Sequence, residues 1–149
     1  MKEKERLIII SNEKTSCNDG KFYCDNIDIK SIPEELNKTF EILLIGRKAK
    51  VEKRSNLIKL ENILVASNIF NYLFSIYKTF KNKSAKYLLI SITPYSFIAC
   101  LLLLIFRKNF YVYLRSDGYE EYRCFSRFFG PLIYHIMFTI VSWKAILIS

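Results

Sequence analysis

The part of the chain that decides the fold is residues 86–118, which read KYLLISITPYSFIACLLLLIFRKNFYVYLRSDG. Two apolar runs, 87–92 and 110–115, have the length of buried strands and enclose a helical segment. Thr93-Pro94 has the form of a helix N-cap followed by proline, and Arg107-Lys108 places two cations at the negative end of that helix. A strand, a helix and a second strand in this order predict parallel pairing through a crossover helix.

The same alternation continues toward both ends of the chain. Further buried strands are predicted at 7–11, 41–46 and 145–148, and a short one at 57–60. The expected helices are 31–40, opened by a capping box at Ser31, then 66–80, 93–108 and one that starts at Asp117 and is interrupted at Gly130-Pro131, with a polar loop at 11–26. This pattern predicts an α/β fold: a doubly wound, mainly parallel, Rossmann-like sheet with helices on both faces, in one domain over 1–149.

Composition narrows the class of partner. The 149 residues are 51% hydrophobic and 25% charged, which excludes a disordered or fibrous chain. The 23 basic residues exceed the 14 acidic ones, and the net charge of +9 indicates an anionic partner. Basic residues gather at 46–59 and 78–86, either as a solvated face or as a peripheral contact with an anionic membrane. No RRM, KH or helix-turn-helix pattern accompanies the charge, so we expect no nucleic-acid partner.

The four cysteines predict a reducing compartment. Cys17, Cys24, Cys100 and Cys124 form no CxxC pair, so we expect reduced thiols and no metal ion. The N-terminus has no secretory apolar segment, and the runs 97–106 and 130–143 predict buried or interfacial helices instead of membrane spans. The expected location is the cytoplasm, with peripheral attachment to the inner face of the cytoplasmic membrane.

Polar segments follow several of the predicted strands. In open α/β sheets, ligands bind outside the carboxyl ends of the strands, where 11–21, Thr93-Pro94 and 115–118 are expected to lie. Asp117 either accepts a proton from a sugar hydroxyl or serves only as a helix N-cap. The neighbouring Arg115 either joins that site or forms a surface ion pair with Glu120 or Glu121. No GxGxxG or GxxxxGK[ST] motif is present, which disfavours dinucleotide and P-loop functions.

The segments 93–96 (TPYS) and 111–118 (YVYLRSDG) together resemble the N-terminal domain of family-4 GT-B glycosyltransferases, many of which assemble bacterial surface polysaccharides. The resemblance implies that this chain binds a glycan or lipid-linked acceptor and that a C-terminal domain, absent here, holds the nucleotide-sugar donor. The chain alone would then be inactive, with no organic cofactor. The implied catalytic residue is Asp117, and the implied acceptor contacts are Asn18, Gly20, Thr93, Arg115, Ser116 and Gly118. The alternative is a non-catalytic Rossmann-like module that binds a membrane surface or a protein partner.

Overall fold

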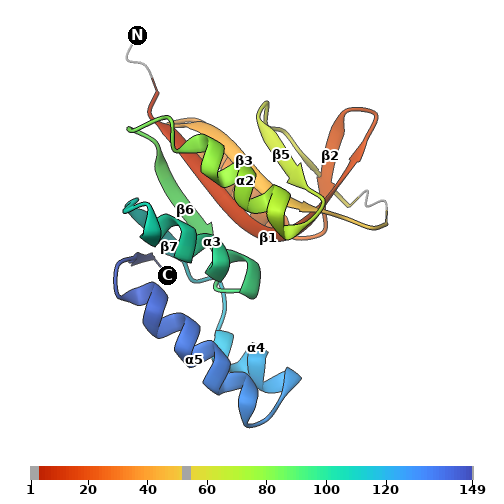
Figure 1. The fold of residues 1–149 in the computed structure, drawn as a ribbon. Coiled ribbons are helices and arrows are strands. Elements are labelled where there is room, and N and C mark those ends of the chain that lie inside the picture. The colour runs from red at the N-terminus through yellow and green to blue at the C-terminus, as the bar shows by residue number, and fades with distance from the viewer. Residues whose placement is uncertain (1–3, 52–54, 149) are drawn as a thin grey trace. The chain divides into compact units, whose positions relative to one another are not determined.

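A computed structural model describes residues 4–51 and 55–148 of the protein. Within these ranges, eight strands and five helices form an α/β fold whose β-structure is mixed and partly parallel (Figure 1). The chain divides into two compact units, Met1–Lys86 and Tyr87–Ser149. The expected α/β class is therefore confirmed, and the sheet is mixed where a mainly parallel one was expected.

The strands of the first unit are paired in the order β4-β2-β1-β3-β5. The pairs β1–β3 and β3–β5 are parallel, whereas β1–β2 and β2–β4 are antiparallel. The central apolar runs 7–10 and 42–45 are buried, which explains why both segments lie inside the sheet. The strands are β1 (Arg6–Asn18), β2 (Lys21–Cys24), β3 (Glu41–Lys48), β4 (Asn56–Ile58) and β5 (Ile63–Ala66).

Strand β1 is longer than the sequence predicts, and the expected loop over 11–26 is wrong. After an irregularity in the register, Thr15 pairs with Lys48, and 16–18 pair with β2. Asp19 and Gly20, with φ of 50° and 73°, form the two-residue turn between the strands. An Asp-Gly pair is a strong hairpin signal because both positions of a type I′ turn require positive φ. Polar residues stay in the strand because this hairpin supplies backbone partners on one side and β3 supplies them on the other.

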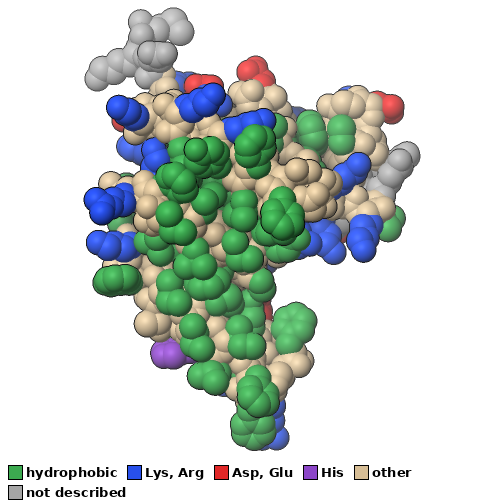
Figure 2. All heavy atoms as spheres, in the orientation of Figure 1, with side chains coloured by type: hydrophobic (Ala, Val, Ile, Leu, Met, Phe, Trp, Pro, Cys, Tyr) green, Lys and Arg blue, Asp and Glu red, His purple; other side chains and the backbone are tan. Residues whose placement is uncertain are grey.

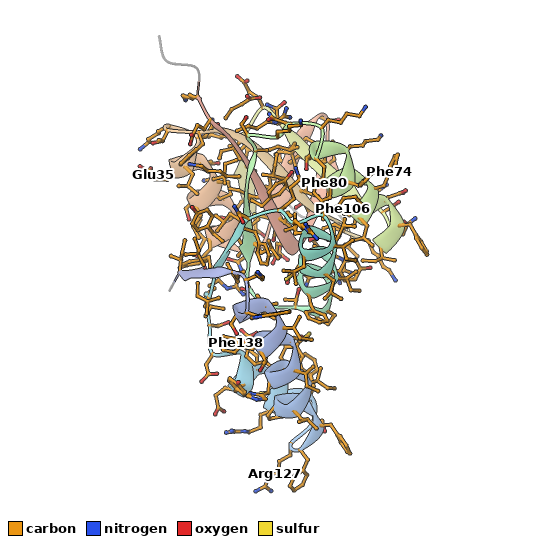
Figure 3. The ribbon with its side chains drawn as sticks, turned by 60° about the vertical axis from the view of Figure 1, so that its left-hand side comes forward. Glu35, Phe74, Phe80, Phe106, Arg127 and Phe138 are labelled. Carbon is orange, nitrogen blue, oxygen red and sulfur yellow. The ribbon has the colours of Figure 1, made fainter. Side chains whose placement is uncertain are left out.

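Helices cover the sheet of the first unit on two sides. In Figure 3, the helix that carries Glu35 and the helix that carries Phe74 lie on opposite sides of these strands. The first, α1 (Ile27–Leu36), begins one turn earlier than expected because the Asn26 side chain accepts a hydrogen bond from the Asp28 N–H at 3.0 Å. The expected capping box at Ser31 is therefore wrong. The second, α2 (Ile69–Thr79), confirms the amphipathic helix, although Ala66 belongs to β5.

The second unit confirms the strand–helix–strand prediction. Its strands pair in parallel in the order β6 (Lys86–Ile90), β7 (Phe110–Tyr113) and β8 (Ile146–Ile148), and α3 (Pro94–Ile105) connects the first two. Thr93 caps α3 through a reciprocal capping box with Ser96. Asp117 caps α4 (Gly118–Phe125). The pair Gly130-Pro131 does not interrupt a helix, because α4 ends before it and both residues lie in the first turn of α5 (Phe129–Ser142).

The first unit exposes apolar side chains on α2, next to the basic segment 78–86 for which the sequence left a membrane contact open. Phe70, Phe74 and Tyr77 are exposed along α2, and the Lys78 ammonium lies 4.4 Å from the Phe74 ring centre. Lys78, the first residue of the basic segment 78–86, therefore lies against an exposed apolar side chain, as expected for this segment. The basic segment 46–59 includes residues 52–54, which lie outside the described residues. Across the described ranges, no helix has both the length and the apolar character needed to cross a membrane.

Candidate functional site

A hollow of the first unit lies where β1 and β3 end. We call it the β1–β3 cavity; its volume is about 410 Å³, within the range of small-molecule sites. Its walls are formed by the second half of β1, the last residue of β3 with the three residues that follow it, and Val65 of β5. The lining residues are Thr15, Ser16, Cys17, Asn18, Lys48, Ala49, Lys50, Val51 and Val65.

The pairing of β1 with β3 builds this cavity. Thr15 lies opposite Lys48, and the Ala49 N–H donates to the Thr15 carbonyl at 2.9 Å, which holds the chain after β3 beside β1. Gly46 allows the close approach, because a Cβ there would lie 3.3 Å from the Thr15 hydroxyl. Thr15 and Ser16 are buried at the base, whereas Cys17 is exposed.

The β1–β3 cavity is electropositive. Lys48 and Lys50 are two basic residues of its lining, and no Asp or Glu is among the lining residues that the structure describes. The Asn18 amide nitrogen is buried and has no hydrogen-bond partner within the described residues, although such groups are almost always paired. Two cations, buried hydroxyl groups and an unpaired amide donor favour an anionic ligand rich in oxygen.

The second unit has a smaller hollow beyond the ends of β6 and β7, which we call the strand-end hollow. It encloses about 10 Å³, roughly the space for one water molecule. The predicted residues Arg115, Ser116 and Gly118 line it. Sequence analysis missed the other lining residues, which are Ser91, Ile92, Leu114, Glu121 and Tyr134. In this arrangement the hollow accommodates a water molecule and not a sugar ring.

The polar groups around the strand-end hollow are arranged by local contacts. Ser116 donates to the Glu121 carboxylate, and Glu120 pairs with Arg123 at 2.6 Å. Neither glutamate therefore forms the ion pair with Arg115 that the sequence left open, and the exposed guanidinium has no ionic partner in the described part of the chain. Burial, followed by nearby negative charge, raises the pKa of the Tyr134 hydroxyl. Tyr134 is therefore a neutral hydrogen-bonding group at neutral pH.

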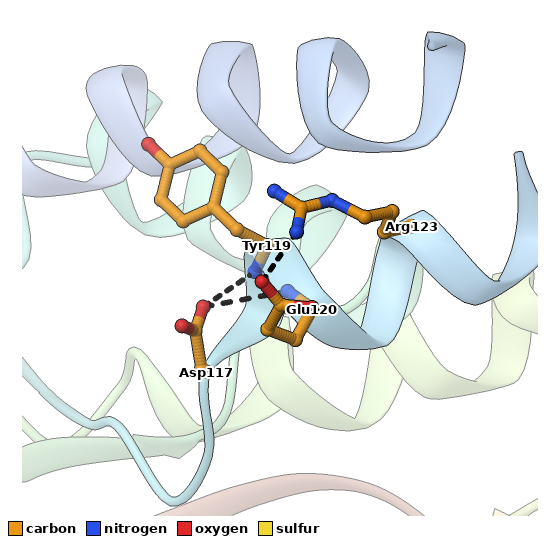
Figure 4. Close-up of polar contacts among 4 residues, drawn as sticks. All are labelled: Asp117, Tyr119, Glu120 and Arg123. Carbon is orange, nitrogen blue, oxygen red and sulfur yellow. Dashed lines mark hydrogen bonds and ion pairs between the residues drawn. The ribbon is translucent and has the colours of Figure 1, made fainter. Parts of the chain in front are cut away.

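Asp117 functions as a helix cap. Its Oδ1 accepts hydrogen bonds from the Tyr119 N–H at 2.9 Å and the Glu120 N–H at 3.4 Å, as Figure 4 shows. Within the described residues, the second carboxylate oxygen, Oδ2, accepts no hydrogen bond. The cap is thus confirmed, and one oxygen stays available to a ligand.

The other predicted site residues lie in different units: Asn18 and Gly20 in the first, and Thr93 in the second. Asn18 lines the β1–β3 cavity, but Gly20 lies in the adjacent turn, with no atom within 4 Å of the position a Cβ would occupy. Its positive φ explains the glycine without a ligand. Thr93 uses its hydroxyl in the capping box with Ser96. The one histidine of the sequence, His135, lies among apolar residues along the chain, a pattern typical of a core position, yet it is exposed, and its Nδ1 lies 2.8 Å from the Tyr119 hydroxyl.

Lys48 and Lys50 are the main binding candidates that sequence analysis did not assign to a ligand site. They appeared only as part of a basic surface segment. The signal that would have found them is Asp19-Gly20, because a hairpin at this point keeps β1 extended and brings 15–18 beside 48–51.

Removal of the cap tests how Asp117 contributes to folding. We expect Asp117→Ala to lower stability by about 1 kcal/mol, or about 2–4 °C in melting temperature, because two backbone N–H groups lose their acceptor. Asp117→Asn retains an acceptor oxygen and should melt close to the wild type. Glu61→Ala, which removes an exposed carboxylate, is the control for charge alone. Wild-type melting of Asp117→Ala would show that the cap contributes nothing.

Models of known protein families do not match this chain, and a search of curated protein sequences finds no similar protein. The class that the structure establishes is an α/β fold, and the function is inferred from the two hollows.

Proposed function

We propose that this chain is the acceptor-binding, Rossmann-like half of a GT-B glycosyltransferase. In this proposal a sugar passes from a nucleotide-sugar donor, held by a second half, to a lipid-linked glycan or polysaccharide at the cytoplasmic face of the membrane. The observation that carries the proposal is the β1–β3 cavity, where Asn18 lies beside two lysines at the carboxyl end of β3. Ligands of α/β proteins bind at such strand ends.

The charge of the β1–β3 cavity favours the phosphate-bearing part of an acceptor. Lipid-linked glycans carry phosphate next to the first sugar, and ammonium groups bind phosphate as point charges. Lys48 and Lys50 would bind this phosphate, while the Asn18 amide would rotate to donate to an oxygen of the ligand. Thr15 and Ser16 supply hydroxyl groups at the base.

Taken by itself, the second unit supplies the groups proposed for chemistry, on the segment 115–118 that follows β7. Arg115 brings a cation that has no ionic partner among residues 4–51 and 55–148, and the Asp117 Oδ2, which accepts no hydrogen bond from those residues, would accept the proton of the acceptor hydroxyl during transfer. The Oδ1 hydrogen bonds orient this carboxylate, since they fix its position on the first turn of α4. Ser116 and Gly118 line the strand-end hollow. Thr93 would contribute indirectly, because its hydroxyl caps α3 and fixes the start of that helix.

Cys17 provides a direct test of acceptor binding, because it is an exposed thiol in the wall of the β1–β3 cavity. We expect a sugar 1-phosphate to slow alkylation of Cys17 about tenfold at ten times its Kd, because the bound fraction is shielded. Alkylation of the exposed Cys124, in the second unit, should not change. Peptide mass spectrometry measures both rates in one sample.

Matched charge variants complete this test. Lys48→Gln with Lys50→Gln should raise the Kd for the sugar phosphate at least about tenfold through the loss of charge-assisted hydrogen bonds. Lys81→Gln with Lys83→Gln removes the same charge from the same unit outside the cavity, and binding should stay unchanged. If inorganic phosphate protects Cys17 as well as the sugar phosphate does, the cavity binds anions in general, and the proposal of a sugar acceptor is contradicted. Protection by neither compound would contradict acceptor binding in this cavity.

The second candidate function is a non-catalytic module that binds a membrane surface or a protein partner. The outer side of α5 favours it, because several large apolar side chains there are exposed to solvent. A chain that binds such a partner but leaves Cys17 unprotected by every phosphorylated sugar would support this second candidate.

A further inference from the structure

Helix α5 is apolar on two sides, although only one side is buried. Its buried residues are Gly130, Tyr134, Met137 and Val141. A second set of large apolar side chains is exposed to between 50% and 79% of its surface. We call this set the outer stripe; it consists of Phe129, Leu132, Ile133, Ile136 and Trp143. Figure 2 shows hydrophobic side chains gathered over the surface along this helix.

The members of the outer stripe lie on one side of α5, and Trp143 is the residue that directly follows the helix. At about 100° per residue, its members fall within an arc of about 100°, next to the buried arc. The polar side chains His135 and Thr139 lie on the remaining side of the helix, outside this arc. Phe125 and Phe128, exposed at 86% and 82%, extend the apolar surface beyond the N-terminus of α5. Soluble monomeric proteins seldom expose so many large apolar side chains together unless a partner covers them.

Cations mark both ends of the outer stripe. Between Arg127 and Lys144 the sequence contains no Lys, Arg, Asp or Glu. Arg127 and Lys144 are both exposed, and the Lys144 ammonium lies 5.8 Å from the centre of the Trp143 ring. An apolar stripe with a tryptophan and a cation at its end matches the boundary between lipid tails and anionic headgroups.

We propose that α5 lies flat in the interface of an anionic bilayer, with the outer stripe in the acyl region and Arg127 and Lys144 at the headgroup phosphates. The 14 residues of α5 span about 21 Å, which suits a helix parallel to the membrane plane. The inference deepens the membrane association in the proposed function and rests on it only for the kind of partner. It assigns the contact to α5, outside the basic segments that the sequence indicated.

The single tryptophan allows a test with the unmodified chain, because Trp143 belongs to the outer stripe. Vesicles of phosphatidylglycerol and phosphatidylcholine in equal parts should shift its emission to the blue and protect it from acrylamide. Pure phosphatidylcholine should bind more weakly, and added salt should weaken binding to the anionic vesicles. Emission that stays unshifted when the chain sediments with vesicles would overturn the assignment to α5.

Substitutions on two helices locate the contact. Leu132→Gln with Ile136→Gln should lower vesicle partitioning about tenfold or more, with an unchanged melting temperature because both side chains face solvent. Phe70→Gln with Phe74→Gln on α2 is the matched control and should bind as the wild type does. Loss of binding in the α2 variant alone would overturn the inference.

The remaining outcomes separate this inference from the proposed function. A wild-type chain that binds no vesicle contradicts membrane association altogether, whereas Cys17 protection by a sugar phosphate would still support acceptor binding. A dimer that Leu132→Gln with Ile136→Gln dissociates would show that a second copy covers the outer stripe, and would overturn the lipid assignment.

Discussion

Replacing Gly130 with alanine is expected to disrupt the pairing of α4 with α5. Gly130 is buried in the first turn of α5, and a Cβ there would overlap the Tyr122 carbonyl oxygen and lie 2.6 Å from its carbon. Both groups belong to backbone, so neither can move away cheaply. We expect a loss of about 3 kcal/mol or more, because overpacking against a helix backbone displaces the whole helix.

A comparison among glycines makes the prediction for Gly130 specific. Gly118→Ala should also destabilise strongly, since a Cβ there would collide with the Tyr134 ring. Gly20→Ala meets no atom within 4 Å and should cost only about 1 kcal/mol, because alanine resists the φ of 73°. Urea unfolding measures the three values, and hydrogen exchange locates the loss in α4 and α5. A Gly130→Ala chain as stable as Gly20→Ala would contradict the close approach of the two helices.

The four thiols are expected to separate into two reactivity classes. Cys17 and Cys124 are exposed, whereas Cys24 and Cys100 are buried. Burial raises the pKa of Cys100 from 9.0 to about 12, because the thiolate is poorly solvated inside the protein. Since the thiolate is the reactive form, we expect Cys100 in the native chain to react at least about a thousandfold more slowly than in the unfolded chain.

The pH dependence of stability should show the same shift. The folded chain keeps the Cys100 proton to about pH 12, whereas the unfolded thiol releases it above 9.0. The unfolded state therefore binds fewer protons in this window, and stability should fall as pH rises through it. Cys100→Ala should remove this part of the decline.

Labelling with a thiol reagent, with and without urea, measures the difference in the reaction rate of Cys100 between the native and the unfolded chain. Rapid native labelling of Cys100 would contradict its burial.

The sequence predicts those parts of the structure that depend on neighbouring residues. The apolar runs 7–10 and 42–45 form buried strands because few other environments accept so many aliphatic side chains in succession. The caps at Thr93 and Asp117 form because each side chain satisfies N–H groups within three residues. The resemblance to a glycosyltransferase domain rests on the same segments and stays a prediction.

Competing local signals limit prediction elsewhere. Ser31 with Glu34 has the spacing of a capping box, yet Asn26 caps α1 five residues earlier, and the Ser31 hydroxyl donates to the Ile27 carbonyl inside the helix. The segment 11–18 is polar, yet it continues β1 because β2 and β3 supply hydrogen-bond partners. Asp19-Gly20 carried the decisive local signal for that hairpin.

The sequence alone determined the α/β class, the strand–helix–strand order of the second unit and two of its helix caps, because these depend on contacts close along the chain. Only the tertiary structure decided that Asn18 lies beside Lys48 and Lys50, since strand pairing joins segments about thirty residues apart. It also decided which side of α5 is buried. That helix is apolar on two sides, so its sequence cannot distinguish the side that packs on the protein from the side left exposed.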